Sequence, residues 1–238
     1  MNSTEPLRRA FFRRACGCTL GLAGATGMLP AFAADGKKST LTPDEALARL
    51  QKGNVGFLDK PNVTMQDRAR RLEIARGQAP FAVLVGCSDS RVPPEVLFGS
   101  GLGELFIVRN AGNTVDTVAL GSIQYGVAVL GAPLIVVLGH QRCGAVEAAV
   151  AVVEKNATFP GSIGQMVEPI VPAVLKARAA GFKGDELLDE AVRQNVRRVV
   201  ERLRTSEPLL IEPLRAGKLK VVGARYDLDD GKVNFFMT

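Results

Sequence analysis

The sequence predicts a single α/β domain: a mostly parallel β-sheet flanked by helices, with an antiparallel strand at its C-terminal edge. Three observations indicate this class. Wholly apolar runs of strand length recur along the chain, and segments of helical length separate them. At the C-terminal end, two segments with alternating apolar and polar residues flank a turn. With 238 residues, 47% of them hydrophobic and 23% charged, the chain can bury a full core.

The first half of the folded part alternates helices with buried strands. Thr42-Pro43-Asp44-Glu45 combines an N-cap, a proline at the first helical position and a capping-box glutamate, so a helix should begin there. Gly77 and Gly131 mark the ends of two later helices. The elements expected are helices at 43–52, 66–76 and 114–130 and strands at 81–86, 104–108 and 134–138.

The second half is expected to be mainly helical and to end in a hairpin. A turn at Asp229-Asp230-Gly231 separates the last two strands. The longest helix repeats apolar residues at spacings of three and four, which predicts one core face. The elements expected are helices at 144–153, 163–179 and 185–204 and strands at 219–226 and 232–237.

Residues 1–33 have the layout of an export signal. Four arginines precede an apolar run of fifteen residues at 15–29, which is too short to span a bilayer, and Ala31-Phe32-Ala33 forms a small-x-small cleavage pattern. Residues 7–13 resemble a twin-arginine signal, which implies export to the periplasm or beyond and a partner in the export machinery. A general secretory signal and an uncleaved anchor are the alternatives. The expected domains are this signal, a linker at 34–41 and a catalytic domain at 42–238.

The charge balance argues against a nucleic-acid partner. The formal net charge of +6 falls to +3 without the signal, because four arginines and one glutamate leave with it. The arginines of the helix at 185–204 lie near Asp189 and Glu190, which is typical of a solvated face with helix ion pairs. We therefore expect neither nucleic-acid nor anionic-membrane binding.

The chemistry-bearing residues follow the ends of two predicted strands. Cys87 follows the strand at 81–86; His140, the only histidine, follows the strand at 134–138, and Cys143 comes three residues later. Ligands bind at the carboxyl edge of a parallel sheet, so these side chains should meet there. Two thiolates and an imidazole suit Zn²⁺, and three protein ligands leave a position open for catalysis. A Cys87–Cys143 disulfide and a closed structural zinc site are the alternatives.

Asp89 and Arg91 follow the first cysteine in a turn that allows a bidentate ion pair. A carboxylate held by a guanidinium keeps a low pKa and accepts a hydrogen bond, so Asp89 could orient a zinc-bound hydroxide towards an electrophile. A turn-capping aspartate beside a surface arginine is the alternative.

Two motifs carry a family resemblance. Cys87-Ser88-Asp89-Ser90-Arg91 and His140-Gln141-Arg142-Cys143-Gly144, with 52 residues between Cys87 and His140, resemble the β-class carbonic anhydrases, and the resemblance covers nearly all of residues 42–238. It implies that zinc is bound by Cys87, His140 and Cys143. It also implies that Asp89 either takes the fourth metal position or pairs with Arg91 and frees that position for water, which makes Asp89 and Arg91 the catalytic pair.

The resemblance further implies a substrate pocket and an oligomer. Gln78 matches a glutamine that binds substrate or bicarbonate, and Phe106 and Tyr125 match residues that line a narrow apolar pocket, often at a subunit interface. Ordinary core packing is the alternative for the two aromatic residues. A homodimer or homotetramer is expected, because the family completes its sites across subunits.

The implied reaction is the reversible hydration of CO₂ to bicarbonate and a proton, by attack of zinc-bound hydroxide on CO₂. The alternative is a related zinc enzyme that acts on another small electrophile, such as carbon disulfide. Because the sole histidine is used as a ligand, buffer, Tyr125 or a water chain must carry the proton away. The absence of tryptophan argues against the Trp-containing inhibitory bicarbonate pocket of some members, and Ala111, where others have a bulkier residue, suggests a wider pocket.

Overall fold

A computed structural model describes residues 38–60, 68–205 and 207–238; the predicted signal and the first half of the linker lie outside these ranges. The central feature is one five-stranded sheet with the order β2-β1-β3-β4-β5. Its strands are β1 (Ala82–Gly86), β2 (Leu105–Arg109), β3 (Leu134–His140), β4 (Lys220–Tyr226) and β5 (Val233–Phe236). All neighbouring strands pair in parallel except β4 and β5, which pair antiparallel. The predicted α/β class, with its antiparallel C-terminal strand, is confirmed.

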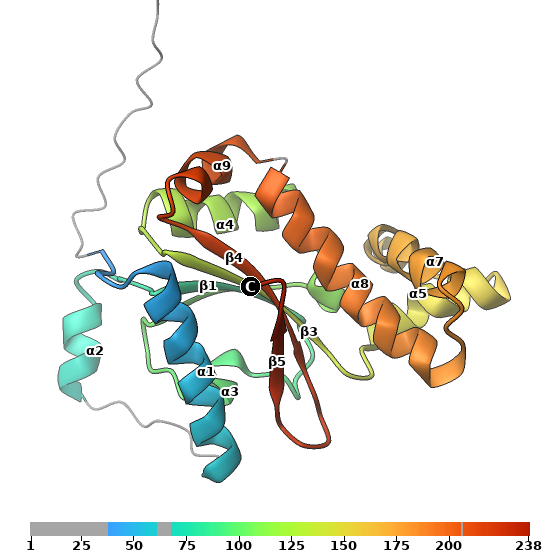
Figure 1. Cartoon of the computed structure of the whole chain (residues 1–238), viewed down its shortest axis with the longest axis horizontal. Coiled ribbons are helices and arrows are strands. Elements are labelled where there is room, and N and C mark those ends of the chain that lie inside the picture. The colour runs from blue at the N-terminus through green and yellow to red at the C-terminus, as the bar shows by residue number, and fades with distance from the viewer. Residues whose placement is uncertain (1–37, 61–67, 206) are drawn as a thin grey trace, which may run out of the picture. The chain divides into compact units, whose positions relative to one another are not determined.

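Helices cover both faces of the sheet (Figure 1). One face packs against α1 (Pro43–Asp59) and α3 (Pro94–Leu97). The other packs against α4 (Thr117–Ala128), α8 (Gly184–Thr205) and α9 (Pro208–Arg215). A third core cluster joins α5 (Gly144–Lys155), α7 (Val171–Ala179) and the first half of α8 around Cys87 and Cys143. The two thiols therefore lie where the sheet meets a helical layer.

The register of the parallel strands positions the site. Every residue of β1 and β3 is buried, because helices cover both faces of these two central strands. Gly86 at the end of β1 pairs with Leu138 of β3 and with Arg109 at the end of β2. The carboxyl ends of all three strands thus meet at one edge. β3 continues through His140, two residues beyond the predicted end, so the imidazole is fixed by the strand itself.

The first helix is seven residues longer than predicted. Thr42 caps it as expected, with the reciprocal Glu45 contact of a capping box, but α1 continues past Gly53 to Asp59. A Cβ on Gly53 would lie 2.0 Å from the carbonyl oxygen of Phe98, so this glycine allows close packing against the end of α3 instead of ending the helix. The buried amide of Asn54 then bonds to Leu97 O and Gly231 O.

The predicted helix at 163–179 is divided in two. The structure has α6 (Ser162–Val167), a 3₁₀ turn at Glu168–Ile170, and then α7. Pro169 and Pro172 lack the backbone N–H that a continuous helix would need at these positions. The short helix α3 and the helix α9 were not predicted. The charged helix expected at 66–76 is α2 (Arg68–Ile74), and no residue in it is buried.

The other predicted elements are found within a few residues of their expected bounds. Asp116, whose carboxylate accepts a hydrogen bond from Ala119 N, starts α4 three residues later than expected, after a 3₁₀ turn at Ala111–Asn113. In the part of the chain that is described, no helix has the length and apolar character to cross a bilayer.

Candidate metal centre

Three potential metal ligands meet at the carboxyl edge of the sheet. Cys87 follows β1, His140 ends β3, and Cys143 is the N-cap residue of α5. Their ligand atoms lie within 4.8 Å of one another, and the side chains are 5%, 0% and 1% exposed. The two Sγ atoms are 3.9 Å apart and both cysteines are free thiols, so the alternative of a disulfide is not what the structure contains.

The imidazole of His140 is oriented for metal binding through Nε2. Its Nδ1 lies 2.9 Å from the carbonyl oxygen of Gln141, and since that oxygen can only accept, Nδ1 carries the hydrogen. In the neutral imidazole, Nε2 then carries the free lone pair; it is buried and has no hydrogen-bond partner among the described residues. Burying a ring nitrogen without a partner is unfavourable unless a metal takes its lone pair. With two sulfur ligands beside it, this set fits a zinc ion.

The contact between the two thiols favours ionisation of Cys87. A hydrogen bond from Cys143 lowers the pKa of Cys87 to about 4, with support from the backbone N–H of Gly112. The same contact raises the pKa of Cys143, because its proton is held against the Cys87 sulfur. The Gly112 N–H lies 3.2 Å from Cys87 Sγ. Gly112 has φ +68°, and a Cβ there would lie 2.6 Å from Ile170 Cδ1, so only glycine brings this N–H to the sulfur.

Asp89 and Arg91 form the predicted bidentate pair beside the ligands. Arg91 donates from Nε to Asp89 Oδ1 (3.0 Å) and from Nη2 to Oδ2 (2.7 Å), and its backbone N–H adds a third bond. These bonds hold the pKa of the Asp89 carboxyl well below its usual range. Asp89 Oδ2 is also 3.8 Å from His140 Nε2, which is too long for a hydrogen bond but places the carboxylate at the edge of the ligand set.

Arg109 supports the first ligand loop, although it was not predicted as a site residue. Its Nε donates to the carbonyl oxygen of Cys87 (2.8 Å) and its Nη2 to that of Asp89 (2.6 Å). The β1–β2 register explains this reach, because Arg109 pairs with Gly86, the residue before Cys87. The position of Arg109 directly after a predicted strand was the available signal, since that strand ends at the same edge of the sheet.

The three predicted substrate residues do not join the ligands within one chain. Gln78 is exposed in the segment before β1, and Tyr125 on α4 is 45% exposed. The rings of Phe106 and Tyr125 contact each other, with centroids 6.1 Å apart. Phe106 pairs with Val83, which is four residues and therefore about 13 Å along the strand before Cys87. Within one chain, Phe106 and Tyr125 therefore do not form the predicted apolar pocket beside the ligands.

A cavity of about 470 Å³ adjoins the first ligand loop. Ser88 and Ala111 line it on the side of the sheet, and Gln165 and Met166 of α6 line the opposite side. Ala111, whose small size suggested a wider pocket, is one of the residues that line this cavity.

Known proteins resemble this chain in sequence and structure. Residues 82–233, which contain all three ligands and reach into the last strand, match the family model described as carbonic anhydrase. The Mycobacterium tuberculosis protein named carbonic anhydrase 2 is 41% identical over 191 residues, covering 80% of this chain and 91% of that protein.

Solved structures share the fold. One of two tetrameric β-carbonic anhydrases from Sordaria macrospora aligns with a TM-score of 0.65 and 26% identity, covering 71% of this chain and 86% of that one. A Coccomyxa β-carbonic anhydrase in complex with acetazolamide aligns with a TM-score of 0.64 and 28% identity, covering 81% and 86%. With a buried Cys₂His centre that fits zinc, the chain belongs to the β class of the carbonic anhydrases, zinc enzymes that interconvert CO₂ and bicarbonate.

Proposed function

We propose that this chain catalyses the reversible hydration of CO₂ at the centre formed by Cys87, His140 and Cys143. The observation that carries the proposal is the buried, unpartnered Nε2 of His140 next to two thiols. Three protein ligands leave one position open on zinc, which is typical of a catalytic site. Zinc, when bound, supplies the positive charge that lowers the pKa of water towards about 7.

Asp89 would act as a hydrogen-bond acceptor for the reacting water. Because Arg91 keeps its carboxyl ionised, Asp89 can accept a hydrogen bond but not donate one. A water whose hydrogen points to Asp89 turns a lone pair towards CO₂. Arg91 acts through Asp89 by fixing the carboxylate, and with both oxygens bonded to Arg91 the carboxylate would leave the fourth position on a bound zinc to water.

A second copy of the chain would complete the substrate pocket. The exposure of Gln78 and Tyr125 supports this proposal, because both are available to another subunit. The Sordaria macrospora enzymes that this chain resembles are described as tetrameric. We therefore propose a homodimer or homotetramer in which Gln78, Phe106 and Tyr125 of one subunit line the CO₂ pocket of another. Sedimentation of the wild type and of Tyr125→Arg tests the assembly, and a wild type that sediments as a monomer would contradict it.

CO₂ is favoured over carbon disulfide as the substrate. The named relatives that match most of this chain are carbonic anhydrases. The alternative is distinguished by measuring hydrogen sulfide release from carbon disulfide on the same sample that is tested with CO₂.

The first experiment is stopped-flow CO₂ hydration with zinc quantified on the same sample. About one zinc per chain, with hydration that a chelator abolishes, supports the proposal. Zinc without hydration at both neutral and alkaline pH would instead favour another small electrophile as the substrate.

We also propose that residues 1–33 direct export of the catalytic domain at 42–238 through the twin-arginine pathway to the periplasm. Support comes from the paired Arg8 and Arg9, the apolar run at 15–29 and the small residues at 31–33. Replacing Arg8 and Arg9 by lysine should leave the protein in the cytoplasm. Unchanged export would point to Arg13 and Arg14 or to the general secretory route.

A further inference from the structure

The second ligand loop, residues 140–143, is attached to the turn that joins β4 to β5. Gln141 N donates to the carbonyl oxygen of Tyr226 (2.9 Å). The Gln141 side chain bridges to the same turn: its Oε1 accepts from Leu228 N (3.0 Å) and its Nε2 donates to Asp229 Oδ2 (2.9 Å). The turn therefore contacts the residue directly after the ligand His140.

Arg142, the next residue, has a left-handed backbone with φ +50°. This conformation is unfavourable for a residue with a Cβ, so it needs support from its surroundings. The support is a bidentate ion pair, in which Arg142 Nη1 and Nη2 donate to Asp229 Oδ2 (3.0 Å) and Oδ1 (2.7 Å). Immediately after this turn the chain reaches Cys143, whose sulfur lies 3.9 Å from that of Cys87.

The left-handed turn also connects the two ligand loops. The carbonyl oxygen of Arg142 accepts a hydrogen bond from Arg91 Nη2 (3.3 Å), the same nitrogen that bonds to Asp89. The conformation of Arg142 thus determines the position of Cys143. It also determines the position of the Arg142 carbonyl oxygen that Arg91 contacts.

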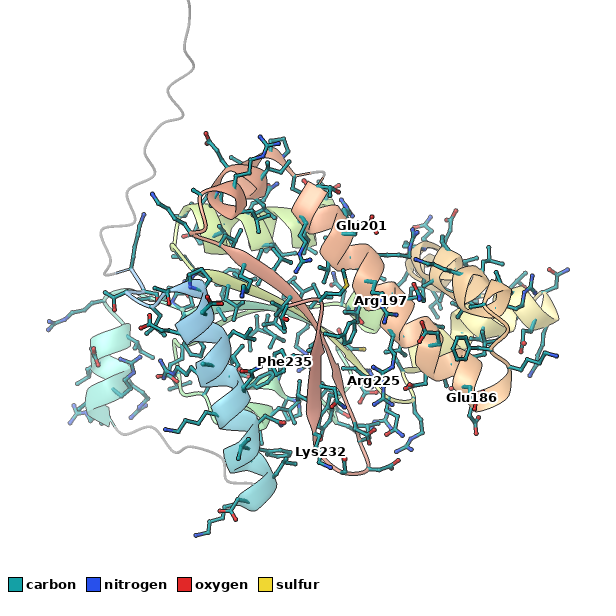
Figure 2. All side chains as sticks on the ribbon, in the orientation of Figure 1. Glu186, Arg197, Glu201, Arg225, Lys232 and Phe235 are labelled. Atoms are coloured by element: carbon teal, nitrogen blue, oxygen red, sulfur yellow. The ribbon has the colours of Figure 1, made fainter. Side chains whose placement is uncertain are left out.

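We propose that Asp229 is a positioning residue for the metal centre: it fixes Arg142 in the left-handed turn that places Cys143 as a ligand. This inference rests on the zinc site of the proposed function. Asp229 is ionised at neutral pH, because Arg142 and Gln141 lower its pKa to about 2. In Figure 2, Arg225 on β4 and Lys232, the residue before β5, lie on either side of the turn that carries Asp229.

Because the Arg142–Asp229 pair is exposed, its effect on metal binding can be measured apart from its effect on the stability of the fold. The side chains of Arg142 and Asp229 are 51% and 63% exposed, and ion pairs at such positions contribute little to the free energy of unfolding. A change at Asp229 should therefore leave the melting temperature of the metal-free protein nearly unchanged. An effect on metal binding would then come from the loop and not from loss of the fold.

The test measures zinc release from the loaded protein to a chromogenic chelator. Asp229→Ala should release zinc about 10–100-fold faster than the wild type, as is typical when a residue that supports a ligand is lost. Asp229→Asn, which keeps a partner for the Gln141 amide, should have a smaller effect. Asp230→Ala is the matched control, since Asp230 lies in the same turn but bonds to Lys232, and its release rate should equal that of the wild type.

A rescue variant tests the mechanism of positioning. Glycine adopts the left-handed conformation without steric cost, so Arg142→Gly added to Asp229→Ala should restore slow zinc release. The absorption spectrum of the cobalt-substituted protein should change in Asp229→Ala and return to the wild-type form in the double variant. Equal effects at Asp229 and Asp230, an unchanged rate in Asp229→Ala, or no rescue by glycine would each overturn the proposal.

These measurements are made without CO₂. A wild type that binds zinc but does not hydrate CO₂ would contradict the proposed function and leave the test of Asp229 valid.

Discussion

The two ligand loops are supported in different ways. The first, residues 87–91, is fixed by the Asp89–Arg91 pair inside it and by Arg109 on the neighbouring strand. The second, residues 140–143, depends on a turn that is distant in sequence, since Arg142 and Asp229 are 87 residues apart. Parallel strands bring the loops together, but the first loop is held by a pair inside it and by the adjacent strand, and the second by a turn 87 residues away. A short motif therefore contains part of what holds the first loop and little of what holds the second.

Removing a zinc ligand should have the largest effect on metal binding and activity. The effect should be the same whether the ligand is removed from the first loop or from the second. Cys87→Ser and Cys143→Ser each leave two protein ligands, because a serine hydroxyl is not among the side chains that bind zinc well. Both variants should lose bound zinc and CO₂ hydration, as measured by metal analysis and stopped flow. Near-wild-type melting of the metal-free proteins would show that the fold persists. Retention of zinc by one variant alone would mean that the centre depends on only one loop.

The pair inside the first loop should behave as a unit. Asp89→Ala and Arg91→Ala should each lower kcat/KM about 100-fold, and the double variant should lose little more, because Arg91 acts through the carboxylate. Stopped-flow CO₂ hydration of the three variants and the wild type completes the cycle. Additive losses would show that the two residues act separately.

Weakening the support that Arg109 gives to the first loop should have a smaller effect than the two changes described above. Arg109→Lys keeps the charge but loses the planar fork that reaches both carbonyl oxygens, so zinc release should accelerate about tenfold. Arg49→Lys is the control, because Arg49 pairs with Glu104 on the surface. Combining Arg109→Lys with Asp229→Ala should multiply their separate effects if the loops are supported independently.

A combined effect that differs from that product would contradict independence. It would show that the Arg91–Arg142 contact between the loops transmits the change from one to the other.

The sheet and the metal ligands could be predicted from the sequence for one physical reason. Apolar runs identify buried parallel strands, and such strands place the residues that follow them at one edge. Cys87, His140 and Cys143 could thus be grouped from the strand pattern alone. The Asp89–Arg91 pair was accessible because its two members are only two residues apart.

The features that were missed depend on contacts between distant segments. The bonds from Arg109 to the first loop follow from strand register, and the Arg142–Asp229 pair follows from the position of the last hairpin. The end of α1 was predicted seven residues too early, and the small size of Gly53 within this helix serves packing against Phe98. Local propensity describes the isolated segment, and tertiary contacts change the outcome.

Two glycines of α1 should have the smallest effects on the ligand loops and opposite effects on stability. A Cβ on Gly56 would have no atom within 4 Å, so Gly56→Ala should stabilise the protein by about 1 kcal/mol through helix propensity. Gly53→Ala should instead destabilise it by about 1–3 kcal/mol, because the new methyl group would overlap Phe98 O. Denaturant unfolding measures both changes. Gly56→Ala adds no contact and should leave zinc release unchanged. Asn54, next to Gly53, bonds to Gly231 in the turn that carries Asp229, so faster release in Gly53→Ala alone would show that strain in α1 reaches the second loop through this turn.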